Sequence, residues 1–371
     1  MSGVVRFVHE FGKGLGKASP TLRRALHALR EQAQVAHHSL AQRVPALIRP
    51  DTVSLTVAIT ARCNQRCHGC LYERGFMAGQ QLSDRVLDEL VDDAASLGIR
   101  SLRLYGGEPL LHPSLARTVA RAVDRGVDPY VTTNGVLLEQ RVDELFGAGL
   151  RHMTFGLYGT GKGYDDYVGR AGNYARLERG IAAVRDRYGA AVRLRMNWLL
   201  MRPTCNDEAL RAAWDFACRY ATPMQIDLVH YSLPYFTEGP ERELQFRPED
   251  RPAIERLVAQ LAAWKRERPD LIETSDMALR AIPDWLLRGS EMKVPCDKYR
   301  MLWIGADGTV QLCYVTFKLG NLNETRLIDL VGSPAHAQAA RDAFALRCPN
   351  CHCGYDERTR KHLPSRRAYG G

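Results

Sequence analysis

The fold is decided by a ten-residue stretch, Ala61–Cys70, which reads Ala-Arg-Cys-Asn-Gln-Arg-Cys-His-Gly-Cys. Cys63, Cys67 and Cys70 are separated by three residues and then by two. A short loop with this spacing can turn three thiolates toward one point, and thiolate is a soft ligand that suits zinc, copper(I) and iron–sulfur clusters. A closed zinc site needs four protein ligands, and His68 would have to fold back to be the fourth. Three cysteines on an iron–sulfur cluster would instead leave one iron open, so the loop indicates a catalytic metal centre.

Length and composition describe a globular protein that works where thiols stay reduced. The 371 residues are enough for two or three domains, or for one large domain with an appendage. Apolar residues make up 45% and charged residues 25%, and no apolar run reaches the roughly 18 residues of a membrane span. The N-terminus does not read as a secretory signal. We therefore expect a cytoplasmic protein whose ten cysteines serve metal binding or catalysis rather than disulfides.

The net charge of +9 lies at the two ends of the chain. Residues 1–50 hold eight Lys/Arg against two Glu, residues 354–371 hold five against two acidic residues, and residues 51–353 are balanced. The balanced part has no run of basic residues interleaved with aromatic residues, so nucleic-acid binding is not expected. The basic ends therefore say little about the substrate.

The first 50 residues are predicted to form a basic helical arm. Leu22, Leu26 and Leu29 recur at helical spacing, and Pro20 fits the first turn of such a helix. This helix could touch an anionic membrane surface, but we favour a helix that packs on the outside of the main domain. The histidines of the arm show no spacing typical of metal ligands; they are His9, His27, His37 and His38.

Segments typical of strands and helices alternate along the next 180 or so residues. The expected strands are 53–60, 101–105, 128–133, 152–157, 192–200 and 224–230. The expected helices are 83–97, 114–125, 138–147, 173–188 and 207–220. Such alternation predicts βαβ units and a parallel sheet, here a partial TIM-type barrel. In barrels of this kind the chemistry collects in the loops that follow the strands, which is where the three cysteines lie.

Two further motifs follow the second and third predicted strands. The second strand ends in Gly106-Gly107-Glu108-Pro109, and the third ends in Thr132-Thr133-Asn134-Gly135. Cysteines spaced three and then two, followed in order by these motifs, resemble a radical S-adenosylmethionine (radical SAM) enzyme. The resemblance covers about residues 53 to 353. It implies a partial (β/α)6 barrel, in which the first of the two motifs receives the amine of SAM.

The resemblance also implies a set of metal and SAM ligands. Cys63, Cys67 and Cys70 would hold a [4Fe–4S] cluster whose open iron binds SAM, and one electron from an external reductant such as flavodoxin or ferredoxin would cleave SAM to a 5′-deoxyadenosyl radical. Gly69 departs from the family, which often has an aromatic residue at this position. The residues that match SAM-binding positions are Tyr72, Gly106, Gly107, Glu108, Thr133, Asn134 and Asn197. A structural zinc loop is the alternative for the three cysteines.

The C-terminal segment carries a second set of cysteines. This set consists of Cys296, Cys313, Cys348, Cys351 and Cys353. A hairpin of strands 302–305 and 309–315 is predicted around Gly308, with a helix near 326–344 after it. The pattern resembles the twitch or SPASM auxiliary domain of radical SAM enzymes. It implies one auxiliary [4Fe–4S] cluster on the first four cysteines and leaves Cys353 over. Structural zinc is the alternative here too.

Other residues in or just beyond the predicted strands are candidates for the substrate pocket. Cys205 follows the fifth strand and could donate a hydrogen atom to a substrate radical, although an ordinary loop position is favoured. The remaining candidates, each equally compatible with packing, are Tyr158, Arg195, His230, Tyr231 and Tyr235.

The predicted organisation is an α/β protein in five parts. A basic helical arm (1–50) precedes a radical SAM partial barrel (51–235). A helical connector (236–290) then leads to a small α+β auxiliary-cluster domain (291–355) and a basic tail (356–371).

The predicted function follows from the resemblance. In this family the auxiliary domain accompanies peptide modification, dehydrogenation of alcohols and activation of sulfatases. We expect an oxidative modification, by dehydrogenation or cross-linking, of a peptide or a small natural-product intermediate. A redox-neutral epimerase or adenosyl transferase is the first alternative. A non-catalytic metal-binding module is the second, although the two motifs after the strands would have no role in it.

Overall fold

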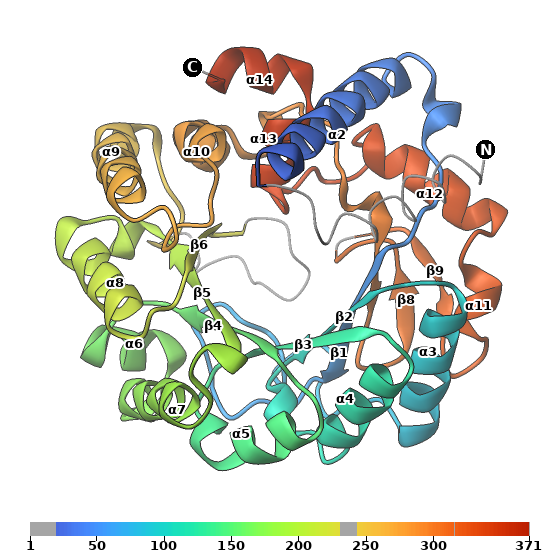
Figure 1. Cartoon of the computed structure of the whole chain (residues 1–371), viewed down its shortest axis with the longest axis horizontal. Coiled ribbons are helices and arrows are strands. Elements are labelled where there is room, and N and C mark those ends of the chain that lie inside the picture. Colours follow the sequence, from blue (N-terminus) through green and yellow to red (C-terminus); the bar gives the residue numbers. More distant parts are fainter. Residues whose placement is uncertain (1–19, 231–242, 315, 371) are drawn as a thin grey trace.

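A computed structural model describes residues 20–230, 243–314 and 316–370. A curved sheet lies at the centre, and helices cover its outer side (Figure 1). The first six strands are parallel and adjacent in the order β6-β5-β4-β3-β2-β1. They are β1 (Ser54–Thr60), β2 (Ser101–Gly106), β3 (Asp128–Thr133), β4 (His152–Leu157), β5 (Arg193–Leu200) and β6 (Met224–Leu228). This arrangement confirms the predicted partial barrel.

Helices connect successive strands, as a parallel sheet requires. They are α3 (Asp84–Ser96), α4 (Leu115–Asp124), α5 (Leu138–Gly147), α6 (Gly161–Val168), α7 (Asn173–Tyr188) and α8 (Asp207–Arg219). The side chain of Ser83 accepts a hydrogen bond from the backbone N–H of Val86 and so caps α3, as expected from the sequence. Only α6 was not predicted, because it has just eight residues and two of its first three are glycines.

Strand β5 shows how the barrel separates its core from its interior. Leu194, Met196, Trp198 and Leu200 are buried under the helices, with at most 1% of each residue exposed. Because side chains alternate along a strand, the residues between them face the other side of the sheet. Each large apolar side chain buried in this way contributes about 1.5–3 kcal/mol to stability.

The C-terminal segment extends the same sheet. Strand β7 (Met301–Ile304) pairs in parallel with β1, and β8 (Thr309–Gln311) and β9 (Lys318–Asn321) follow in antiparallel order. The predicted hairpin at Gly308 is confirmed, and its φ of 84° is one that glycine tolerates best. The predicted helix 326–344 is in fact two helices, α11 (Leu327–Leu330) and α12 (Pro334–Phe344). The break falls where a proline begins the second helix and the preceding serine caps it.

Four more helices complete the C-terminal half. They are α9 (Arg251–Glu267), α10 (Asp276–Arg288), α13 (Tyr355–Lys361) and α14 (Leu363–Tyr369). A basic tail was expected over 356–371, but much of this segment is packed rather than solvated. Arg358 is 1% exposed and Thr359 is 0% exposed, and the hydroxyl of Thr359 accepts a hydrogen bond from Trp285 of α10. The division into five domains stays a prediction.

The N-terminal helix α2 (Pro20–Ala41) lies beside α13, far from it in sequence (Figure 1). Leu22 and Leu29 of the predicted apolar stripe are 47% and 61% exposed, so this part of the stripe is not packed on the barrel. The C-terminal end of the helix is anchored instead, since Ala41 is fully buried. Among the described residues, no helix is both long enough and apolar enough to cross a lipid bilayer.

Candidate active site

The three-cysteine loop begins where β1 ends. Backbone hydrogen bonds fix it: the N–H of Arg66 donates to Val168 and the N–H of His68 donates to Tyr167, over 2.9 and 2.8 Å. The guanidinium of Arg74 donates to two carbonyl oxygens of the loop, which closes it from the other side. The loop therefore has a defined shape without a disulfide.

The donor set of this loop fits a metal cluster. Burial raises the pKa of Cys63 to about 12 and also raises the pKa of Cys67 and of Cys70. The charges of Cys63 and Cys70 further raise the pKa of Cys67, which places the three sulfurs near one another. Thiols in this setting become thiolates only beside a cation. Their role as iron ligands stays a prediction.

Gly106 and Gly107 let strand β2 end close against this loop. A Cβ added at Gly106 would lie 2.2 Å from the carbonyl oxygen of Thr60, and one at Gly107 would lie 2.4 Å from those of Ala61 and Arg62. Side chains at these positions would push the cysteine loop away. The two glycines are therefore needed for the close approach of this backbone, whereas their predicted contact with SAM stays a prediction.

The side chain of Glu108 holds the loop that follows β3 by hydrogen bonds. Its carboxylate is fully buried and accepts hydrogen bonds from the hydroxyl of Thr133 (2.7 Å), the N–H of Asn134 (2.7 Å) and the N–H of Leu110 (2.9 Å). The side-chain amide of Asn134 then donates to Asn64 in the cysteine loop. Glu108 thus links the two predicted SAM-binding loops. Its predicted contact with the SAM amine remains a prediction.

A cavity of about 1040 Å³ opens beside these loops. All three loop cysteines line it, as do Gly106, Gly107, Thr133 and Asn134. Tyr72, predicted to lie beside the adenine of SAM, is also on the wall, and its hydroxyl donates to that of Tyr105 over 3.2 Å. The structure therefore brings the predicted SAM-binding residues, apart from Glu108, to one surface.

The inner face of the barrel supplies a polar wall to the same cavity. Arg195 and Asn197 of β5 line the cavity. Because side chains alternate along a strand, both residues face the interior of the barrel. The Oδ1 atom of Asn197 is buried without a hydrogen-bond partner among the described residues, as expected for a group that meets a ligand. Gln225 and Asp227 of β6 lie on the same wall. Sequence reasoning missed these two, although polar residues alternating along a buried strand were a usable signal.

Two charged residues on this wall, Arg195 and Asp227, lie near groups of opposite charge. Arg195 forms an ion pair with Glu273 at 3.4 Å. Burial raises the pKa of Asp227, and the nearby charges of Arg103 and Arg195 oppose that rise. The wall therefore combines donors and acceptors that a polar substrate can use.

The candidate pocket residues divide into three groups. Tyr158 and His230 line the cavity with Arg195, and a catalytic role for any of them stays a prediction. Cys205 does not line it; it packs against the apolar core beyond the end of β5, and burial raises the pKa of its thiol to about 11. Tyr231 and Tyr235 fall outside the described residues.

The second cysteine set surrounds a smaller cavity next to the first. All five thiols of the set line this cavity. Cys353 lines the large cavity as well, and its sulfur lies 3.9 Å from Nδ1 of His230. A hydrogen bond from Cys353 lowers the pKa of Cys351 to about 6. This donor set fits an iron–sulfur cluster, with Cys353 placed between that centre and the active-site cavity.

Two cations line the second cavity, Lys298 and Arg358, and the sequence did not reveal the role of Arg358. It is buried on α13, where its guanidinium donates to the carbonyl oxygens of Cys351 and Val294 and to Asn350. It also lies 4.7 Å from the ring centre of Trp285. Its charge helps to lower the pKa of Cys351. No local motif marks this residue: it follows Cys353 by five residues, but its partner Val294 lies 64 residues earlier in the chain.

Taken together, the barrel and the site define a metalloenzyme with one cysteine-rich centre on the large cavity and a second around the smaller cavity beside it, and Cys353 lines both. The family model of the radical SAM superfamily matches residues 57–202, and that of the iron–sulfur cluster-binding domain SPASM matches residues 296–353. The chain belongs to the radical SAM superfamily. It accordingly uses a SAM-binding [4Fe–4S] cluster, an auxiliary iron–sulfur cluster and SAM.

Several curated relatives of the chain share the name GTP 3′,8-cyclase. The chain is 31% identical over 253 residues to the GTP 3′,8-cyclase of Lactiplantibacillus plantarum, covering 66% of this chain and 67% of that protein. It is 34% identical over 156 residues to the GTP 3′,8-cyclase of Chlorobaculum tepidum, covering 41% and 46%. The chain spans about half the length of the first curated relatives it matches.

Solved structures share the fold at low sequence identity. The protein anSMEcpe with bound AdoMet has a TM-score of 0.61 and 17% identity, covering 78% of this chain and 84% of that one. Streptococcus suis SuiB bound to S-adenosylmethionine has a TM-score of 0.58 and 16% identity, covering 87% and 71%. These likenesses concern the fold alone.

One prediction from the sequence is wrong. We expected oxidative modification of a peptide or a natural-product intermediate, with an epimerase or adenosyl transferase as the alternative. The curated relatives are named GTP 3′,8-cyclases, which contradicts that expectation, while the radical SAM chemistry itself is supported. The cysteine motifs fix the radical chemistry, whereas the substrate depends on the cavity wall.

Proposed function

We propose that this enzyme abstracts a hydrogen atom from the ribose of a purine nucleotide held in the large cavity beside SAM. The observation that carries the proposal is this cavity itself, which meets the SAM-cluster loop at one end, Cys353 of the auxiliary set at another, and a polar strand face between them. The name of the relatives supplies the substrate class and the 3′ position of the ribose.

The size of the cavity supports two ligands. Pockets for one ligand of drug size measure about 300–1000 Å³. At about 1040 Å³ this cavity lies at the upper end of that range, a size that supports binding of SAM together with a second small molecule. The polar wall formed by Asn197, Gln225 and Asp227 offers the amide and carboxylate groups that a base or a ribose can hydrogen-bond.

The charge of the cavity suits phosphates. Six cationic and four anionic side chains line it. Three of the anionic groups are paired with cations of the same wall: Glu273 with Arg195, Asp356 with Arg360, and Glu357 with Lys298. The cations are therefore in excess, and Arg is suited to phosphate oxygens because of its planar fork of donors. The cationic residues are Arg66, Arg103, Arg195, Lys265, Lys298 and Arg360.

In this role the residues of the chain position and shield the reactants. When bound, the first cluster supplies the electron that cleaves SAM to the 5′-deoxyadenosyl radical. Thr133, Asn134 and Asn197 would hold SAM by hydrogen bonds, while Gly106 and Gly107 let β2 end close against the cysteine loop. The electron would come from an external protein such as flavodoxin or ferredoxin. We place the protein in the cytoplasm, where its thiols stay reduced.

The test is substrate-dependent cleavage of SAM. Enzyme reconstituted anaerobically with iron and sulfide is given SAM, dithionite and one of GTP, ATP or a mixture of short peptides. We expect GTP to raise the rate of 5′-deoxyadenosine formation by about ten-fold over the rate without substrate. A rate that is the same with and without every nucleotide would contradict the proposal.

Two arginines on one strand provide a matched pair of variants. Arg193 and Arg195 both pair with Glu273, but only Arg195 lines the cavity. Arg195→Gln should raise the KM for GTP about ten-fold, because a guanidinium hydrogen bond to a charged group contributes about 1.5–3 kcal/mol. Arg193→Gln should leave that KM unchanged. Equal effects of the two substitutions would show that Arg195 acts only through Glu273.

A further inference from the structure

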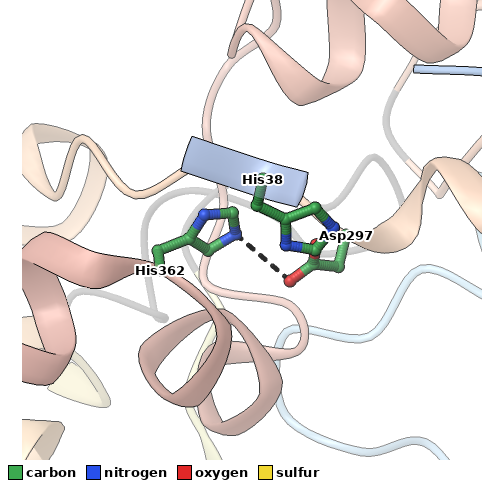
Figure 2. Close-up of side chains that lie close together, drawn as sticks. All are labelled: His38, Asp297 and His362. Atoms are coloured by element: carbon green, nitrogen blue, oxygen red, sulfur yellow. Dashed lines mark hydrogen bonds and ion pairs between the residues drawn. The ribbon is translucent and has the colours of Figure 1, made fainter. Parts of the chain in front are cut away.

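A second group of metal-type ligands lies outside the cavity. His38 comes from helix α2, Asp297 directly precedes the short 3₁₀ helix Lys298–Arg300, and His362 lies between α13 and α14. Figure 2 shows the three side chains pointing toward one another. They are 5%, 5% and 1% exposed. The sequence did not suggest this group, because its members come together only through the fold.

The geometry of the group is that of a partial coordination shell. One ligand atom from each side chain lies within 4.8 Å of the other two. Nε2 of His38 is 3.4 Å from Oδ1 of Asp297, and Nε2 of His362 is 3.3 Å from Oδ2. The imidazole rings stack with centres 4.9 Å apart and planes 15° apart. The two imidazole Nε2 atoms thus face the two carboxylate oxygens.

Some polar atoms of these three side chains have no hydrogen-bond partner among the described residues. Oδ1 of Asp297 is buried and has no hydrogen-bond partner among the described residues. A buried carboxylate oxygen without a partner is costly, unless a cation lies beside it. Nδ1 of His38 and Nδ1 of His362 likewise lack a hydrogen-bond partner among the described residues.

We propose that His38, Asp297 and His362 bind a divalent transition cation of the zinc class. Two imidazoles and one carboxylate form a donor set that zinc accepts, with water in the fourth position. The ring of Phe344 lies 5.6 Å from that of His38 and 5.9 Å from that of His362, so the site has an apolar side that limits exchange with solvent. The three residues are separate from the walls of both cysteine-lined cavities.

The metal would fasten the N-terminal helix to the C-terminal half. The described contacts of α2 with that half include only a few polar ones, such as the ion pair between Glu31 and Arg360 at 2.6 Å. Metal binding to a site that exists only in the folded chain stabilises the fold. Asp297 also follows Cys296 directly, so the cation would hold the backbone that carries one auxiliary thiol.

The test measures zinc separately from iron. Holoenzyme is dialysed against micromolar zinc and then against metal-free buffer, and zinc, iron and sulfide are counted per chain. We expect about one zinc per chain in the wild type and in His37→Gln, a control whose residue is exposed on the same helix. His38→Gln and His362→Gln should lose this zinc and keep their iron. Zinc retained in both variants, or absent from the wild type, would overturn the proposal.

A spectroscopic measurement keeps the proposal testable if either variant fails to fold. Zinc-edge X-ray absorption on the wild-type holoenzyme distinguishes nitrogen and oxygen ligands at about 2.0–2.1 Å from sulfur at about 2.3 Å. We expect the shorter distances. A zinc ion bound through sulfur would belong to the cysteines and would overturn the proposal.

Discussion

The two cysteine centres are built in opposite ways. The first takes its thiols from eight consecutive residues of one loop, Cys63 to Cys70, which is held by local backbone hydrogen bonds. The second collects five thiols from Cys296 to Cys353 and is supported by Arg358, which links the segment 348–353 to Val294, near Cys296 in the chain. The first centre can therefore be recognised in the sequence as a motif, whereas the second can be recognised there only in part.

This difference predicts how each cysteine centre should tolerate substitutions. A loop motif fails when a ligand is lost, because no other thiol of its own segment can replace it. A centre assembled from distant segments has a spare thiol, Cys353, but it relies on tertiary contacts that can be lost one at a time. The predictions below test this contrast.

The largest effect should come from the first centre. Cys63→Ala removes a ligand that no neighbour replaces, so 5′-deoxyadenosine formation should fall by at least ~10³-fold. Iron should fall from about eight to about four per chain. Iron, sulfide and deoxyadenosine are measured on enzyme reconstituted in parallel with the wild type. Activity within ten-fold of the wild type would remove the contrast between the centres.

The second effect concerns the tertiary support of the auxiliary centre. Arg358→Met leaves the oxygens of Val294, Cys351 and Asn350 without their donor, which should cost about 3 kcal/mol. We expect a melting temperature several degrees lower and a loss of auxiliary iron, with the first cluster retained. Arg367→Met, at an exposed position near the same end of the chain, is the control and should change stability little. Equal melting temperatures of the two variants would sink this prediction.

The third effect is a pH dependence from the support of the first centre. Burial raises the pKa of Glu108 from 4.5 to about 7, against the hydrogen bonds from Asn134, Thr133 and Leu110. The folded chain then binds this proton more tightly than the unfolded chain. The group therefore lowers stability as pH rises from about 4.5 to 7, with its full effect above 7.

Glu108→Gln removes this ionisation and tests its sign. The variant should show a shallower fall in melting temperature between pH 6 and pH 8 than the wild type, both measured without SAM. At pH 6 it should be less stable by about 1–3 kcal/mol, because the new NH₂ group faces a hydrogen-bond donor. An unchanged slope would show that the carboxylate does not titrate in this range.

The smallest effect should come from the spare thiol. Cys353→Ala leaves four cysteines in the auxiliary set, so iron should stay near eight per chain and SAM cleavage should change by less than about three-fold. The count is made on the same preparation as the activity. A loss of about four irons would identify Cys353 as a ligand and reverse the prediction that the first four cysteines are sufficient.

The sequence allowed the barrel to be predicted because its signals are local. Strand and helix patterns alternate, and Ser83 marks a helix start as expected. Helix α6 was missed for lack of a strong pattern. Helices α13 and α14 were missed because Arg358 and Lys361 suggest solvent, while the fold buries both. A long cationic side chain is buried only where partners satisfy it. Glu357 pairs locally with Lys361, but the Val294 partner of Arg358 lies 64 residues away.

The candidate site divides along the same line. The cysteines and the glycine motif could be named in advance, since each acts within its own loop. Glu273 and the histidine–aspartate group could not, because their neighbours come from other elements. Asp227 was missed although the alternation of polar residues along its strand was a usable signal. The predicted substrate was wrong for a related reason: the motifs that define the family lie at the SAM end of the cavity, not along the wall that would contact the substrate.

The most direct test of the account follows one hydrogen atom. Reconstituted enzyme is allowed to react with SAM and with GTP that carries deuterium on every ribose carbon. The deuterium content of the 5′-deoxyadenosine is then measured by mass spectrometry. If the cavity holds a nucleotide beside SAM, the product gains deuterium in a GTP-dependent manner. If deoxyadenosine forms with no deuterium while GTP is present, the radical takes its hydrogen elsewhere and the proposed substrate is wrong.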